Sequence, residues 1–294
     1  MYKELIITGA SPAYESSLLA LLGSLNCNWP GHPPVLVYDL GMSETTLSIL
    51  DSAGIEVRKV PAFCPHWRSH FTWKPWCFHD APCESYLWID SGICVLRPID
   101  EAFVANRKMG YFCVAINELL QPYVNEPLRR ALGVTPEEVD TLVSIGSGIH
   151  GFYKQGVGEK LVKHALELAL IEENMKATEP LHRHDQALLT LLLYKYFSPI
   201  LYADHHEYCW YEGTHPNYRQ KVWAHSRKML PEDMVYFHQY VGKSGPPYLP
   251  RPLPPRQEPS FLMKLRIRIA KLRGRYPGDD RVDNDTTMYN GMRD

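Results

Sequence analysis

Short apolar runs alternate with amphipathic stretches through the first half of the chain. Residues 5–7, 35–37 and 86–89 are continuous apolar runs, and leucines at helical spacing lie between the first two, at residues 18–25. Apolar runs of this length, bounded by turn residues, are typical of strands buried on both faces. Strands that alternate with helices in this way predict right-handed crossovers and a mostly parallel sheet flanked by helices. The expected fold class is therefore α/β.

The second half of the chain has a less regular pattern. Residues 109–115 and 149–153 have the composition of strands, whereas residues 158–173 and 184–196 have the periodicity of helices. The apolar run at 234–237 predicts one more strand, which would place the following histidine at a strand end.

The composition changes again near the end of the chain. Residues 245–259 (GPPYLPRPLPPRQEP) are rich in proline, which indicates the end of a domain or an extended strap. Residues 261–275 (FLMKLRIRIAKLRGR) then place leucine and isoleucine at helical spacing, with lysine and arginine on another face. Such a helix either binds an anionic membrane surface or packs on the domain with its basic face in solvent. The predicted organisation is a globular domain, a linker or strap, and a basic helix with a polar tail, over residues 1–245, 246–260 and 261–294.

Composition and charge exclude several classes of protein. The chain has 294 residues, of which 45% are hydrophobic, enough to bury a substantial core. Its formal net charge of −2 gives no global basic field, so a nucleic-acid partner is not expected. No apolar stretch approaches the roughly 20 residues that a membrane-spanning helix needs. Seven cysteines without regular spacing favour a reduced, cytoplasmic protein, with peripheral membrane association through residues 261–275 as an open alternative.

An aspartate interrupts the most apolar part of the sequence. In SYLWIDSGICVLRP (85–98), Asp90 stands between two apolar runs that both read as buried strands. A buried carboxylate without a partner would cost several kcal/mol or take up a proton. Asp90 therefore needs a partner or a water-filled cleft, unless it is only a turn or cap residue.

The segment just before this strand is dense in aromatic and metal-binding residue types. Residues 64–83 (CPHWRSHFTWKPWCFHDAPC) hold three cysteines and three histidines, but no tight C-x2-C pair of the kind that structural zinc sites show. Packing of the aromatic residues is therefore favoured over zinc. Lys74 lies between Trp73 and Pro75 and is either a surface lysine with a buried stem or a cation that faces a diphosphate.

The amino-terminal strand ends in a glycine turn, ITGAS (7–11). A strand, a glycine turn and a helix N-terminus can bind phosphate, but the further glycines of the dinucleotide fingerprint are absent. This excludes a dehydrogenase site and leaves Thr8 and Gly9 as candidates to lie beside a nucleotide base.

Several segments together resemble the GT-A-fold glycosyltransferases. WKPW followed by YLWIDSGICVLRPID is similar to the stretch in which those enzymes deliver an acidic motif to a nucleotide-sugar. Further similar segments follow in the same order, namely IGSGIHGFYK (145–154), HRHDQALLTLLL (182–193) and VYFHQYVGKSGPPY (235–248). VYDLGMS (37–43) also resembles an early turn of the group. The resemblance spans residues 4–248, is nearest to glycosyltransferase family 8 and related uncharacterised bacterial glycosyltransferases, and implies a GT-A fold.

The resemblance implies roles for individual residues. The candidates for the donor site are Thr8, Gly9, Lys74, Asp90, Ser91, Gly92, His238, Gly242 and Lys243. The candidates for contact with the sugar or the acceptor are Ser147, Gly148, His184 and Gln186. Asp185 is the candidate general base if the reaction inverts the anomeric centre, and a sugar-positioning residue if it retains it. The simpler alternatives are a helix N-cap for Asp185 and a plain turn at residues 147–148.

The sequence departs from the family pattern at the acidic motif. The usual Asp-x-Asp is here Asp90-Ser91-Gly92, so the second carboxylate is missing. Asp90 and His238 are the candidate protein ligands for Mn²⁺ or Mg²⁺, with phosphate oxygens and water completing the coordination. Weak metal binding, or none, with Lys74 and Lys243 compensating the phosphate charge, is the alternative.

The expected activity is transfer of a sugar from a nucleotide-sugar donor to the hydroxyl group of a glycan or lipid-linked acceptor, in surface polysaccharide or glycoconjugate synthesis. The missing carboxylate keeps a second hypothesis open, a catalytically silent nucleotide-sugar-binding module on the same fold. A zinc-dependent hydrolase built on residues 64–83 ranks last.

Overall fold

The computed structural model describes residues 1–177, 182–203, 207–208, 220–225 and 229–248. The chain divides into two units, residues 1–250 and residues 251–294. The predicted basic helix at 261–275 and nearly all of the predicted strap lie outside the described residues, so the expected boundaries at 245 and 260 stay predictions.

Helices and strands alternate along the described chain. In chain order they are β1 (Tyr2–Ala10), η1 (Pro12–Tyr14), α1 (Glu15–Asn28), β2 (Val35–Asp39), α2 (Glu44–Ser52), β3 (Glu56–Lys59), α3 (Trp73–Asp80), β4 (Cys83–Ile89), β5 (Ile93–Val95), α4 (Asp100–Met109), β6 (Tyr111–Phe112), β7 (Ala115–Leu119), η2 (Gln121–Tyr123), α5 (Glu126–Leu132), α6 (Pro136–Val139), β8 (Val143–Ile145), β9 (Ile149–Tyr153), α7 (Val157–Ala169), α8 (Glu172–Met175), α9 (His184–Phe197), β10 (Val222–Ala224) and α10 (Pro231–His238).

The central sheet has six strands in the order β3-β2-β1-β4-β9-β6. Strands β3, β2, β1 and β4 are parallel, and β9 runs antiparallel between β4 and β6. Two smaller antiparallel pairs, β5 with β10 and β7 with β8, complete the described strands. The α/β class with a mostly parallel sheet flanked by helices is confirmed.

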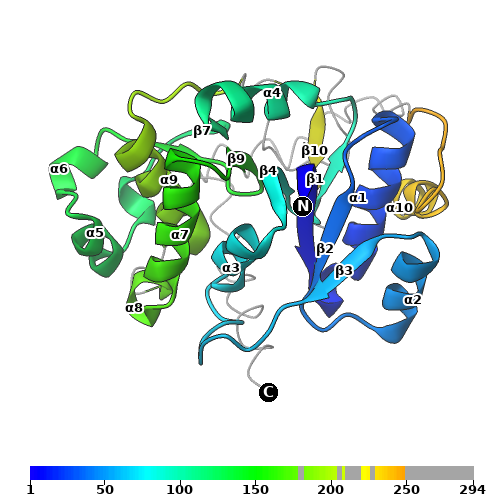
Figure 1. The fold of residues 1–294 in the computed structure, drawn as a ribbon, viewed down its shortest axis with the longest axis horizontal. Helices are drawn as coiled ribbons and strands as arrows, with labels where there is room; N and C mark the ends of the chain where they lie inside the picture. The colour runs from blue at the N-terminus through cyan, green and yellow to red at the C-terminus, as the bar shows by residue number, and fades with distance from the viewer. Residues whose placement is uncertain (178–181, 204–206, 209–219, 226–228, 249–294) are drawn as a thin grey trace, which may run out of the picture. The chain divides into compact units, whose positions relative to one another are not determined.

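Both faces of the central sheet are covered by helices, as Figure 1 shows. Leu5 and Ile7 of β1 point to a core that also holds apolar side chains of α3, α7 and α9. Ile6, between them, points to the other face and packs with residues of α1 and α4. Period-two alternation along a strand produces this division. Because no face of the strand is left to solvent, the sequence is apolar at every position from 5 to 7.

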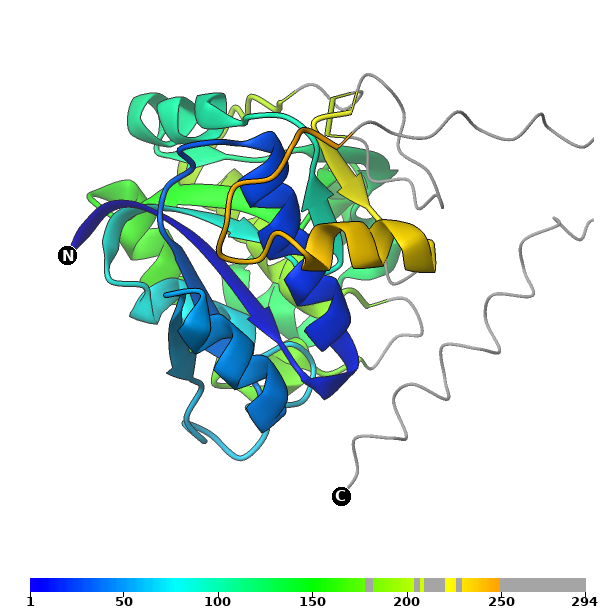
Figure 2. The same cartoon turned by 90° about the vertical axis from the view of Figure 1, so that its right-hand side faces the viewer.

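The predicted strand at 234–237 is wrong, because these residues lie in the helix α10. Pro231 stands in the first turn of the helix, followed by Glu232 and Asp233, and this combination favours a helix N-terminus. Figure 2 shows α10 beside α1, and the polypeptide backbone at Phe237 packs directly on Gly23. The short apolar run is therefore part of a helix that packs on α1.

The predicted strand at 109–115 is divided in the structure. Met109 ends α4, Gly110 follows in the left-handed conformation with φ of 89°, and only Tyr111 and Phe112 pair with β9. A left-handed glycine of this kind ends many helices, since the conformation costs glycine little.

None of the helices in the described part of the chain is long and apolar enough to cross a membrane.

Candidate functional site

Three charged residues from separate elements meet at the carboxyl end of β4. Asp90 follows β4 directly, Lys74 lies in the first turn of α3, and Asp185 lies in the first turn of α9. The Lys74 ammonium is 2.9 Å from Asp90 Oδ1 and 2.9 Å from Asp185 Oδ2. The side chains of Lys74 and Asp185 are only 5% and 7% exposed, whereas that of Asp90 is 32% exposed. Asp90 thus forms the solvent-facing side of a buried ionic cluster.

Electrostatics keep Lys74 charged in this environment. Burial by itself would lower the pKa of Lys74, but the attraction of Asp185 and Asp90 outweighs it, so the pKa is raised. The cluster of one ammonium and two carboxylates carries a net charge of −1. The lysine therefore compensates the charge of both carboxylates in a largely buried place.

Aromatic side chains enclose the ammonium group. The rings of Phe71, Trp73 and Trp88 lie 5.3, 6.0 and 5.5 Å from Lys74 Nζ. The Trp88 indole also donates a hydrogen bond of 2.7 Å to Asp90 Oδ1. These rings exclude water from one side of the cluster and strengthen its ion pairs.

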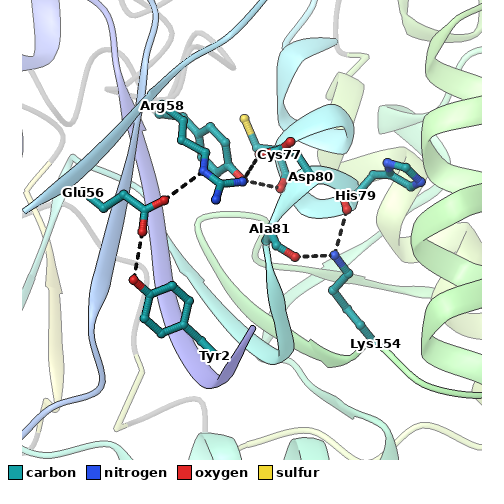
Figure 3. Close-up of polar contacts among 9 residues, drawn as sticks. Tyr2, Glu56, Arg58, Cys77, His79, Asp80, Ala81 and Lys154 are labelled. Atoms are coloured by element: carbon teal, nitrogen blue, oxygen red, sulfur yellow. Dashed lines mark hydrogen bonds and ion pairs between the residues drawn. The ribbon is translucent and has the colours of Figure 1, made fainter.

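The helix that carries Lys74 is anchored at its other end, shown in Figure 3. Lys154, which follows β9, donates hydrogen bonds to the carbonyl oxygens of His79 (2.7 Å) and Ala81 (2.6 Å), where α3 ends. Arg58 Nη1 lies 3.2 Å from Asp80 Oδ2, and the Tyr38 hydroxyl donates to the same oxygen. Burial lowers the pKa of Lys154. Cations near a helix C-terminus are favourable, so this network fixes α3 and with it the position of Lys74.

Four of the candidate donor-site and sugar-site residues lie close to Asp90 in the structure. The Asp90 backbone N–H donates to the Gly148 carbonyl at the start of β9, at 2.8 Å. Ser91 and Ser147 are buried, and the Gly92 carbonyl accepts a hydrogen bond from the His225 N–H. The segment 145–154 and the strand β4 thus lie side by side, because β9 pairs antiparallel with β4.

The two candidates next to Asp185 are engaged with the protein itself. His184 Nδ1 lies 2.6 Å from the Met175 carbonyl, and the Gln186 side-chain amide donates to Ser144 Oγ at 2.8 Å. These contacts tie the start of α9 to α8 and to the residue at the centre of β8. They fix the direction in which Asp185 points.

The two candidates at the end of β1 differ in their surroundings. Thr8 is fully buried, and its hydroxyl has no hydrogen-bond partner among the described residues. Gly9 faces Trp73, and a Cβ atom at this position would lie 3.0 Å from the indole ring. Gly9 therefore allows Trp73 to approach the sheet next to Lys74.

The late candidates His238, Gly242 and Lys243 pack along α1 and α2. His238 Nε2 is 2.7 Å from the Ser16 carbonyl, in the first turn of α1. Gly242 has φ of +73°, and a Cβ atom there would lie 2.5 Å from the Cβ atom of Ala53. Lys243 lines a shallow pocket of about 310 Å³ with residues of α2. Among the described residues, no contact joins these three to Lys74, Asp90 or Asp185, because the segment that carries them is a helix and a turn rather than a strand.

The described residues around Asp90 provide only part of a metal-binding site. Asp90 offers a partly exposed carboxylate in a cluster of net charge −1, which suits a hard cation. His238 is not brought to it, and the described part of the chain holds no group of three residues that could bind a metal. In the run at 64–83, Cys77 and Cys83 belong to the hydrophobic core, and His66 Nε2 lies 2.9 Å from the Ala169 carbonyl.

Sequence reasoning missed the residues that build the surroundings of this cluster. Trp88 was treated only as an apolar residue of a buried strand, and Phe71 and Lys154 were not singled out. A signal for Trp88 was present, since an indole two positions before an aspartate on the same strand face can reach that carboxylate. For Lys154, distant in sequence from α3, no local signal exists.

Comparison with known proteins identifies similar structures but no sequence family. No family model matches the chain, and no curated protein does. Solved structures do match. The apo form of the glycosyltransferase GlyE from Streptococcus pneumoniae has a TM-score of 0.46 at 13% identity, over 69% of this chain and 46% of GlyE. The chain thus spans less than half of GlyE.

Two further structures match over larger shares of their own length. The galactosyltransferase LgtC, in complex with donor and acceptor sugar analogues, has a TM-score of 0.45 at 14% identity, over 94% of this chain and 99% of LgtC. Core-mannan synthase A from Aspergillus fumigatus, in its Mn/GDP form, has a TM-score of 0.45 at 9% identity, over 66% and 70%. Because these TM-scores are below 0.5, the similarities assign no role to any residue of this chain.

Proposed function

We propose that the chain is a glycosyltransferase that moves a sugar from a nucleotide-sugar donor to an acceptor hydroxyl. The observation that carries the proposal is the cluster of Lys74, Asp90 and Asp185 at the carboxyl end of a central strand. In open α/β sheets this edge is where ligands bind. A charged cluster that is costly to bury and contributes little to stability is typical of a functional site.

The reaction assigns a task to each carboxylate. The acceptor oxygen forms a bond to the anomeric carbon, and the bond from that carbon to the phosphate oxygen breaks. The nucleoside diphosphate leaves with the electron pair. If the centre is inverted, Asp185 takes the acceptor proton as general base; if it is retained, the departing phosphate oxygen takes that proton and Asp185 hydrogen-bonds sugar hydroxyls. Asp90, being partly exposed, faces the donor.

Lys74 has a different task from the one its sequence suggested. Its ammonium contacts both carboxylates, so it holds them in place and does not by itself supply the positive charge that a diphosphate needs. A divalent cation held by Asp90, donor phosphate oxygens and water would supply that charge. Manganese and magnesium both suit these donors. Because Asp90 is a single protein ligand, we expect cation and nucleotide to bind together rather than separately.

The finer assignments belong to the same proposal. We place the activity nearest to glycosyltransferase family 8, with a hexose or related sugar, UDP as the nucleotide, and a glycan or lipid-linked acceptor in polysaccharide or glycoconjugate synthesis. The similarity of four segments in the same order supports this. An acceptor in an anionic membrane would give residues 261–275 a purpose.

Release of nucleoside diphosphate from a panel of nucleotide-sugars tests the proposal. The assay uses Mn²⁺, Mg²⁺ or EDTA, with and without simple sugar acceptors. We expect release from one nucleotide class, loss of release in EDTA, and a loss of at least about 100-fold in Asp185→Asn, within the range for removal of a general base. Folded Asp185→Asn with wild-type turnover would contradict the assignment of Asp185.

The missing second carboxylate favours one other candidate function. With Gly92 in the acidic motif, the protein could bind a nucleotide-sugar without turning it over. Binding of a nucleotide-sugar without any release of nucleoside diphosphate would establish this silent module and contradict the transferase.

A further inference from the structure

The turn that leads into α3 has an unusual backbone. His70 and Phe71 have φ of 57° and 55°, and in the described part of the chain they are the two non-glycine residues with positive φ. Bulky side chains rarely adopt this left-handed conformation, and two in succession are rarer still. Such strain persists where the surrounding structure enforces it, and it is concentrated at binding and catalytic sites.

Burial does not explain why a phenylalanine occupies this turn. Phe71 is 40% exposed, which places it among the exposed large hydrophobic residues of the described chain. Asparagine or glycine would adopt the same backbone with less strain. Contact with the Lys74 ammonium accounts for the covered part of the ring, and the exposed part remains open to a ligand.

The ring of Phe71 lies at the edge of the charged cluster. Its centroid is 5.3 Å from Lys74 Nζ and 5.7 Å from the ring of His184. The ring centroid of His70 lies 5.4 Å from that of His184, so the rings of His70 and Phe71 both lie next to the ring of His184. An exposed aromatic surface thus borders the carboxylates of Asp90 and Asp185.

We propose that Phe71, supported by His184, is a stacking surface for the sugar ring of the substrate. One face of a pyranose carries C–H groups that pack on an aromatic ring, while its hydroxyl groups at the rim can donate to carboxylates. Phe71 supplies the aromatic ring for the C–H groups, and Asp90 and Asp185 supply the carboxylates for the hydroxyl groups. This inference rests on the proposed function and adds a specificity-determining residue to the same site.

Binding affinities of Phe71 variants, measured by calorimetry with the full chain, test the inference. Phe71→Asn introduces a residue that tolerates positive φ, so relief of backbone strain should offset the lost contact with Lys74 and leave the melting temperature within about 3 °C of the wild-type value. Its affinity for the nucleotide-sugar should fall about tenfold, the equivalent of about 1.4 kcal/mol. Its affinity for the nucleoside diphosphate alone should not change. Phe71→Tyr, which keeps the ring, should bind both ligands as the wild type does.

The possible failures are distinguishable. Wild-type affinity of Phe71→Asn for the nucleotide-sugar would overturn the stacking surface and leave the proposed function intact. An equal loss for the nucleoside diphosphate would show that the ring stacks on the base, which also overturns the sugar assignment. If the wild-type protein binds no nucleotide-sugar, the proposed function fails first, and the inference fails with it.

Discussion

At the scale of single residues, the main feature is an ammonium group that two carboxylates keep charged inside the protein. Lys74 has 5% of its side chain exposed and contacts Asp90 and Asp185 at 2.9 Å each. Removing one member of a buried ionic group costs about 3–5 kcal/mol, because the remaining charge is left without compensation. The sequence indicated that Asp90 needed a partner. It could not identify Lys74 and Asp185 as those partners, since Asp185 is brought to Lys74 only by the folding of α9 against the sheet.

Buried histidines predict how stability depends on pH. Burial lowers the pKa of His150 to about 3, with a further lowering by Lys74, and burial lowers those of His182 and His225 to about 4. In the unfolded chain these histidines bind protons below about pH 6.5, whereas in the folded chain they bind protons only near pH 3 to 4. The contribution of these histidines to the free energy of unfolding is therefore fully present above about pH 6.5, and it is lost as the pH falls toward their folded-state pKa values. From pH 7 to pH 5 a histidine shifted as far as His150 contributes a loss of about 2 kcal/mol.

The pH dependence is tested by urea unfolding of the wild type and of His150→Gln at pH 7 and pH 5, since the glutamine side chain cannot titrate. We expect the variant to lose about 2 kcal/mol less than the wild type between the two pH values. His182 and His225 remain in the variant, so the rest of the pH dependence should persist. An identical loss in both proteins would contradict a buried, neutral His150.

At the scale of elements, α1 is the support against which α10 packs. Gly23 of α1 lies against the backbone of Phe237, and a Cβ atom there would be 1.9 Å from the Phe237 carbonyl oxygen. The sequence could not predict this contact, because the run at 234–237 is too short to separate helix from strand by periodicity. Its N-terminal Pro-Glu-Asp was the better signal. By contrast, β1, β2 and β4 were predictable, since their apolar runs are bounded by turn residues.

Gly23→Ala tests this packing. In an isolated helix the change would stabilise by about 1 kcal/mol, but here α10 must move, so we expect a net destabilisation of about 1–3 kcal/mol in urea unfolding. Gly31→Ala is the matched control, because nothing lies within 4 Å of its Cβ position and only its φ of +78° opposes the change. The contact would be refuted if Gly23→Ala were as stable as the wild type while Gly31→Ala was weakened.

At the scale of the whole described domain, the proposed donor site and the network of Arg58 lie at different ends of the strands of the central sheet. Asp90 lies at the carboxyl end of β4, whereas Tyr2, at the start of β1, belongs to the network that includes Glu56 and Arg58 (Figure 3). The sequence placed Asp90 at the carboxyl end of a central strand, and its apolar run before a turn made that position predictable. The position of Lys243 beside α2 was not predictable, since a segment far along the chain can pack on either side of the sheet and the local sequence does not specify which.

The central claim is that the edge with Asp90 binds a nucleotide-sugar. The most direct measurement is a thermal-shift screen of UDP-, GDP-, CMP- and dTDP-sugars, each with Mn²⁺, Mg²⁺ or EDTA. A ligand at about 100 times its Kd adds about 2.7 kcal/mol, which raises the melting temperature of a domain of this size by about 5–10 °C. We predict such a shift for one nucleotide class in the presence of a cation, its loss in Asp90→Asn, and its persistence in Glu137→Gln, which changes an exposed carboxylate of α6. Flat curves for every donor, or an undiminished shift in Asp90→Asn, would contradict the claim.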